Sequence, residues 1–194
     1  MKEKLLLLFL FLIPASAGAE QTLEQKILEK ITKKDAICSS CRFIVQKKTS
    51  TWIKKHDLYA VTTFDILPPP EWNLAVNDKK TIYALDRRNL DDWNQVILAE
   101  NLSLDKDAKI IEYAKFFLST TMNQSEFIDK LLESEIKRIE EKEKKKIDAE
   151  TKIVRSADKI QIVFYANDTQ GDLQQWNMVL KNDGEIVKLQ QRSF

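Results

Sequence analysis

Glycine and histidine are scarce in this chain, and each shortage excludes a class of function. Only 3 of the 194 residues are glycine, too few for the Gly-rich loops that bind phosphates or dinucleotides. The single histidine, His56, excludes an HExxH zinc site and any site that needs two imidazoles. Because His56 lies in a charged stretch, residues 54–57, we expect an exposed side chain rather than a general base.

An excess of charge of either sign is also lacking. The chain has 31 Lys and Arg residues against 30 Asp and Glu residues. Electrostatics therefore give no reason to expect binding to nucleic acid or to an anionic membrane surface. Apolar residues make up 43% of the chain and charged residues 31%, which is typical of a folded globular protein. We expect no cofactor, because no motif for a metal or an organic cofactor is present.

The N-terminus has the pattern of a secretory signal peptide. Lys2 and Lys4 precede a nine-residue apolar run, residues 5–13, which is too short to cross a bilayer. A proline and a series of small residues follow, so we expect a signal peptide at residues 1–19 and a mature chain that begins at Glu20. The alternative cleavage site lies two residues earlier. The sequence thus predicts export to the periplasm or the cell exterior, without stable membrane insertion after cleavage.

Helical patterns occur in the first half and in the middle of the mature chain. Residues 21–34 begin with a Thr22/Gln25 capping box, and a second such box at Asn123/Glu126 predicts another helix start. That second helix is expected to continue into a charged extension over residues 133–150. The most regular pattern lies between these two helices and predicts the best-buried helix, with apolar residues at Ile110, Tyr113, Ala114, Phe117 and Leu118.

Strand patterns dominate the C-terminus. Residues 159–166, 173–180 and 185–191 predict a three-stranded antiparallel meander, with a hairpin signal at Asn182-Asp183-Gly184. Earlier in the chain, residues 58–67 and 81–85 also predict strands, and a triple proline ends the first of them. Residues 38–55 are ambiguous, with a partly helical spacing.

Together these patterns predict a single α+β domain over residues 20–194. We expect amphipathic helices packed on a small antiparallel sheet that ends in the C-terminal meander. This arrangement is similar to cystatin-like and NTF2-like folds, in which a helix packs on a curved antiparallel sheet. The likeness is one of architecture and implies no activity.

Cys38 and Cys41, separated by two serines, form the only compact chemical motif. In an exported protein the pair favours a local disulfide. A thiol–disulfide redox centre is the functional alternative, but a CxxC centre of that kind follows a buried strand, whereas a helical pattern precedes Cys38. A zinc half-site lacks enough ligands, because the chain offers two thiols and one imidazole.

Tryptophan is the other residue type that points to function. Trp72 follows the triple proline, Trp93 is predicted to lie in a polar loop, and Trp52 lies in the ambiguous segment. Tryptophan is enriched at binding hot spots, so these three are candidates for a partner surface, although the commoner role of such residues is to close the core. The sequence therefore favours a non-enzymatic binding or interaction protein whose partner is a protein or a small apolar ligand. The alternative is a thiol oxidoreductase that uses Cys38 and Cys41.

Overall fold

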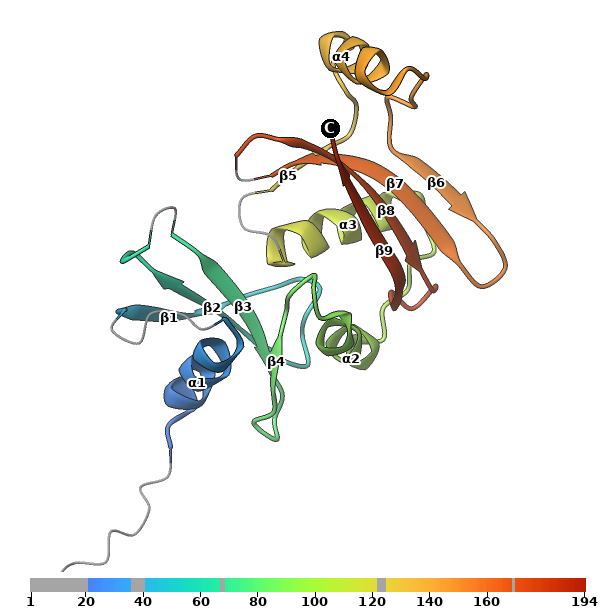
Figure 1. The fold of residues 1–194 in the computed structure, drawn as a ribbon. Helices are drawn as coiled ribbons and strands as arrows, with labels where there is room; N and C mark the ends of the chain where they lie inside the picture. The colour runs from blue at the N-terminus through green and yellow to red at the C-terminus, as the bar shows by residue number, and fades with distance from the viewer. Residues whose placement is uncertain (1–20, 36–40, 67–68, 122–124, 169) are drawn as a thin grey trace, which may run out of the picture.

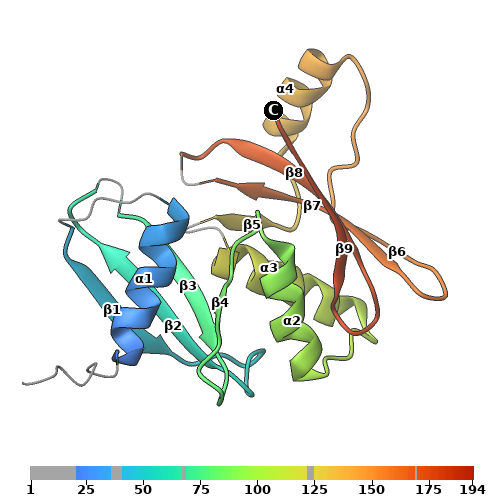
Figure 2. The same ribbon diagram turned by 60° about the horizontal axis from the view of Figure 1, so that its bottom comes forward.

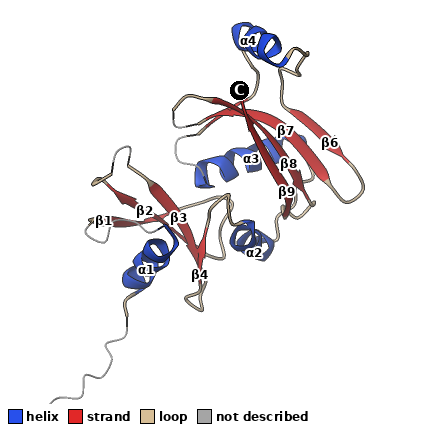
Figure 3. Ribbon diagram, viewed as in Figure 1, coloured by secondary structure: helices blue, strands red, loops and turns tan. Residues whose placement is uncertain are grey.

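The computed structural model describes residues 21–35, 41–66, 69–121, 125–168 and 170–194. These residues form two antiparallel sheets and four helices, joined by turns and loops (Figures 1 and 3). The helices are α1 (Leu23–Asp35), α2 (Leu90–Glu100), α3 (Asp107–Thr121) and α4 (Glu133–Glu143). The strands are β1 (Phe43–Lys48), β2 (Asp57–Thr63), β3 (Glu71–Val76), β4 (Ile82–Ala84), β5 (Glu126–Ile128), β6 (Lys152–Arg155), β7 (Ile160–Asn167), β8 (Leu173–Leu180) and β9 (Ile186–Ser193).

The N-terminal sheet has the strand order β1-β2-β3-β4 and is covered on one face by α1. Ile27 and Ile31 of this helix pack on apolar residues of β2 and β3. The predicted capping box is confirmed: the Thr22 N–H donates to Gln25 Oε1 at 2.9 Å, and the Gln25 N–H donates to Thr22 Oγ1 at 3.2 Å. These two bonds satisfy two of the N–H groups at the start of the helix.

The C-terminal sheet has the order β5-β7-β8-β9, with β6 also paired to β7. The predicted meander is confirmed, since β7, β8 and β9 pair in sequence order. Gly184 makes the last hairpin feasible, because its φ is +91° and a Cβ there would lie 3.0 Å from Ile97.

Helices α2 and α3 lie between the two sheets (Figure 2) and contribute to one core with both of them. At its centre the Trp93 indole N–H donates to Tyr113 Oη at 2.8 Å. The Tyr113 hydroxyl in turn donates to the Gly184 carbonyl at 2.6 Å. Burial raises the pKa of Tyr113, which keeps this hydroxyl protonated and able to donate.

The α+β class is confirmed, but the prediction of one small sheet was incomplete, because there are two. The ambiguous segment contains strand β1, and strand β3 and helix α2 were not predicted. The second capping box does not open a helix. Asn123 lies outside the described residues, and Glu126 begins β5, whose Phe127 stacks on Phe164 of β7 with ring centroids 5.0 Å apart. The helix begins only at Glu133.

Helix α4 packs on the outer face of the C-terminal sheet (Figure 1). Ile139 is buried there against Tyr165 and Leu173. The charged run is helical only as far as Glu143, since Lys144 adopts the left-handed conformation that ends the helix. Ile147 then packs against the same cluster, so the chain returns to the protein sooner than expected. No helix within the described ranges is long and apolar enough to cross a membrane.

Candidate ligand-binding cleft

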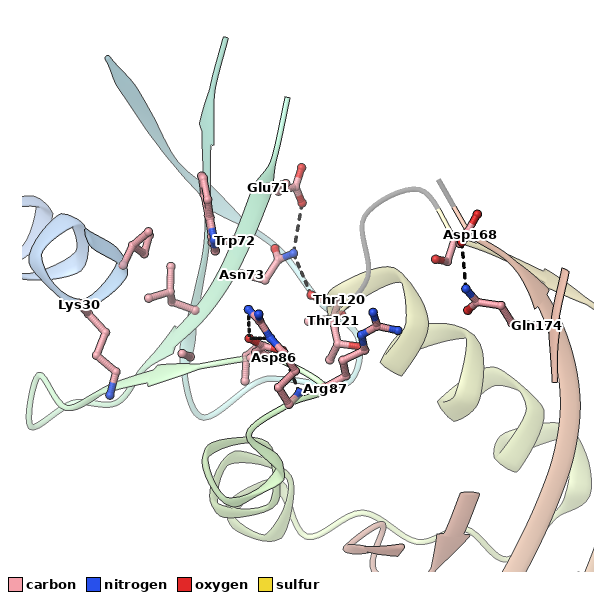
Figure 4. A pocket seen from close by; sticks show the side chains of 16 residues that line it. Lys30, Glu71, Trp72, Asn73, Asp86, Arg87, Thr120, Thr121, Asp168 and Gln174 are labelled. Atoms are coloured by element: carbon pink, nitrogen blue, oxygen red, sulfur yellow. Dashed lines mark hydrogen bonds and ion pairs between the residues drawn. The ribbon is translucent and has the colours of Figure 1, made fainter. Parts of the chain in front are cut away.

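A cleft of about 350 Å³ lies where the two halves of the fold meet. One wall comes from α1, β3 and the segment after β4, and the other from the end of α3 and the turn between β7 and β8 (Figure 4). The volume falls at the lower end of the range for small-molecule sites. Elements far apart in the sequence therefore converge on one polar hollow.

Most of the charged groups in the walls already have partners. Glu71 Oε1 lies 2.6 Å from the Lys48 ammonium, and Arg88 lies 2.9 Å from Asp86. Lys30 at the rim lies 3.6 Å from Asp92 of α2. Each charge is thus largely compensated by the protein itself.

Arg87 is the other cation of the wall. Its guanidinium donates to Gln191 Oε1 at 2.6 Å and lies over the ring of Trp176, 5.7 Å from the centroid. These contacts direct the guanidinium toward β8 and β9, where it borders a separate small hollow and is held by a cation–π contact and a neutral amide.

Gln174 supplies the most unusual feature of the cleft. It is the second residue of β8 and only 5% exposed. Its Nε2 donates to Asp168 Oδ2 at 2.9 Å, and Figure 4 shows this pair across the cleft from Asn73 and Glu71. Gln174 Oε1 is buried and has no hydrogen-bond partner among the described residues. A buried acceptor in this state costs stability, about 1–3 kcal/mol.

Ser125 lines the same cleft and has the same property. Its Oγ is buried without a hydrogen-bond partner in the described part of the chain. Strand pairing places Ser125 on the same inner face of the sheet as Gln174. Phe127 pairs with Ala166, which in turn pairs with Gln174, so these three residues share a face. Ser125 precedes Phe127 by two residues and therefore faces the same way.

The opposite wall is satisfied, in contrast. Asn73 is buried, and its Nδ2 donates to the Thr120 carbonyl at 3.0 Å and to Glu71 Oε1 at 3.2 Å. These bonds join β3 to the end of α3 and so fix the width of the cleft at this point. Of the buried side-chain atoms without a partner among the described residues, Gln174 Oε1 and Ser125 Oγ thus belong to the β5–β8 wall of the cleft, whereas Thr151 Oγ1 and Trp176 Nε1 lie on residues outside its lining.

The structure separates the three candidate tryptophans. Trp72 is half-buried and lines the cleft. Trp52 is half-buried, stacks on Phe116 at 5.9 Å and borders a second hollow of about 650 Å³ beside the end of α2. Trp93 was predicted to lie in a loop, but it lies in α2 and has no exposed surface. Its ring is buried in the core and is not accessible to a partner.

The prediction that His56 is exposed was wrong. Its side chain is 5% exposed, and its Nδ1 lies 2.9 Å from Oε1 of Glu100, which is 2% exposed. Since a carboxylate can only accept, Nδ1 carries the proton and donates it. Glu100 also accepts the N–H groups of Lys54 and Lys55, at 2.8 and 3.0 Å. The pair joins the end of α2 to the segment before β2, and His56 does not line the cleft.

The cysteine predictions stay predictions. Cys38 lies outside the described residues, so neither the disulfide nor the redox centre is tested. Cys41 is half-buried and precedes strand β1, not a helix whose N-terminus would activate a thiolate. Within the described residues, no three His, Cys, Asp or Glu side chains are grouped so that they could hold a metal ion.

Sequence reasoning missed Gln174 and Ser125. A signal for Gln174 was present, because it occupies an inward position of β8 that continues as Trp176, Met178 and Leu180, all buried. A polar residue in such a series needs a partner or a function. No protein-family model, curated protein or solved structure matches this chain.

Proposed function

We propose that this chain is an exported binding protein that holds a small ligand in the cleft between its two sheets. The observation that carries the proposal is the Gln174 side-chain oxygen, which is buried on a residue that lines the cleft and has no hydrogen-bond partner in the described part of the chain. Buried polar atoms in proteins are nearly always paired, and the exceptions are often explained by a ligand or water. Ser125 Oγ, in the same state, adds a second group that a ligand can satisfy.

Binding accounts for the lining better than catalysis does. The described residues around the cleft include no histidine or cysteine. No base among the described residues is hydrogen-bonded to Ser125 Oγ to remove its proton, and Asp168 is already engaged by Gln174. The walls thus present hydrogen-bonding groups without an activated nucleophile.

The test is a ligand screen by two-dimensional NMR on the full mature chain. Monosaccharides, amino acids, small amides, dicarboxylates and diamines are added to labelled protein. At least one compound should shift the Gln174 side-chain amide and the Trp72 indole signal, with saturation. The amide of Asn177 on the outer face of β8 serves as the internal control and should not move. Shifts confined to Trp52, or none at the cleft, would contradict the proposal.

Export is the second part of the proposal and rests on the sequence pattern of residues 1–19. Expression of the full chain in a bacterial host should give a soluble periplasmic protein whose N-terminal residue is Glu20. N-terminal sequencing of the periplasmic fraction measures this directly. Full-length protein retained in the inner membrane would show that the segment is an anchor.

A further inference from the structure

We infer that the ligand of this cleft is a neutral molecule that donates an O–H or N–H hydrogen bond to Gln174 Oε1. The inference rests on the proposed binding function and names the chemistry of what is bound. It follows from three features of the β5–β8 wall: the orientation of the Gln174 amide, the pairing of the surrounding charges, and the Ser125 hydroxyl, which has no hydrogen-bond partner among the described residues.

The orientation of the Gln174 amide is fixed by its neighbour. Asp168 Oδ1 accepts the N–H groups of Gln170 and Asp172, both at 2.9 Å, which holds the carboxylate in the β7–β8 turn. An ionised carboxylate has no proton to donate, so it selects Nε2 of Gln174 as its partner. The amide oxygen, on a residue that lines the cleft, is then the atom without a hydrogen-bond partner among the described residues.

An amide oxygen can only accept, so the complementary group on the ligand must donate. A carboxylate or phosphate would instead place oxygen against oxygen beside Asp168. An anionic group is therefore a poor match for this end of the cleft.

A full positive charge is also a poor match. Glu71 is paired with Lys48 and Asp86 with Arg88, and the Asp168 oxygens accept hydrogen bonds from three neutral N–H groups. An ammonium entering the cleft would lose its hydration and meet only carboxylates that are already ion-paired or hydrogen-bonded. A neutral hydroxyl or amide avoids that desolvation cost and still satisfies Gln174.

Ser125 Oγ offers the ligand a second hydrogen-bonding group, because a hydroxyl both donates and accepts. It can bond an acceptor on the same ligand, so a molecule with neighbouring donor and acceptor groups satisfies both atoms. Sugars and peptide amides have this character. A cleft of about 350 Å³ suits one sugar ring or a short amide rather than a polymer.

Four probes separate the classes: glucose, N-acetylglycinamide, succinate and putrescine, titrated at equal ionic strength. Glucose or N-acetylglycinamide should shift the cleft signals with saturation, and which of the two binds identifies the source of the donor. Succinate and putrescine should neither shift these signals nor compete. Gln174→Met, which keeps the length and removes the acceptor, should weaken binding about tenfold.

Gln175→Met is the matched control, because Gln175 is the next residue of β8 and its Nε2 bonds Tyr165 Oη, away from the cleft. This variant should bind as the wild type does. Circular dichroism and thermal melting establish that both variants are folded before binding is compared.

The outcomes separate the two proposals. Saturable binding of succinate or putrescine at the cleft, or equal affinity for a neutral probe in wild type and Gln174→Met, overturns the inference and leaves the binding function standing. Failure of every compound, in the broad screen and among these probes, to reach the cleft overturns both.

Discussion

Replacing Glu100 with alanine should lower the free energy of unfolding by about 3–5 kcal/mol. The carboxylate is 2% exposed and accepts hydrogen bonds from His56 and from two successive backbone N–H groups. Without it, the buried His56 side chain and two backbone N–H groups lose their acceptor. Domains of this kind have a total stability of about 5–15 kcal/mol, so the loss is a large share. Urea denaturation followed by circular dichroism measures it.

Glu112→Ala provides the comparison, because this glutamate lies on α3 with 60% of its side chain exposed and a single 3.2 Å contact to Lys115. Its removal should change stability by less than about 0.5 kcal/mol. If the two variants unfold at the same urea concentration, Glu100 does not hold α2 to the segment before β2, and the burial of His56 has another cause.

Tyr113→Phe should lower the free energy of unfolding by about 2–4 kcal/mol. The ring is kept and only one oxygen is lost, but that oxygen serves two partners. The Trp93 indole loses its acceptor and the Gly184 carbonyl loses its donor, both in the core. Each then carries the cost of an unsatisfied buried group. Thermal and urea unfolding give the size of the effect.

Tyr59→Phe is the appropriate control, since Tyr59 is half-buried on β2 and its hydroxyl makes no hydrogen bond to another described residue. Its loss should be nearly neutral. A Tyr113→Phe protein as stable as the wild type would mean that water or a shift of the hairpin replaces the missing oxygen.

Local sequence patterns were sufficient to predict those elements whose structure is determined by short-range interactions. Helix α3 has its apolar residues at helical spacing, and all five of those named from the sequence are buried. The C-terminal meander combines alternation with a Gly-containing turn, both of which are short-range signals. The Thr22/Gln25 capping box likewise involves atoms three residues apart.

Elements that depend on distant partners were missed. Strand β3 is buried on both sides, between α1 and the central core, so Leu74, Ala75 and Val76 are all apolar and show no alternation. The Asn123/Glu126 pattern favours a helix locally, but pairing of β5 with β7 and the stacking of Phe127 on Phe164 outweigh it. Trp93 was assigned to a loop because the charged residues between positions 86 and 92 concealed the start of helix α2 and its apolar face.

The cleft could not be predicted for the same reason. Asn73, Thr120 and Gln174 are contributed by elements separated by tens of residues, and the packing of two sheets around α2 and α3 brings them together. Sequence reasoning sought chemistry in compact motifs, whereas the polar atoms left open here belong to a common amide and a common hydroxyl.

The shared core has a consequence for how fast a ligand can enter and leave. Residues of both sheets pack on α2 and α3 in one apolar cluster, so the cleft walls cannot swing apart without exposing that cluster to water. Under the proposed binding function, association then requires no separation of the two sheets, and we expect a rate set by diffusion and orientation, about 10⁵–10⁷ M⁻¹s⁻¹ or faster for a small molecule. Differences in affinity among such ligands would then arise mainly from differences in their dissociation rates.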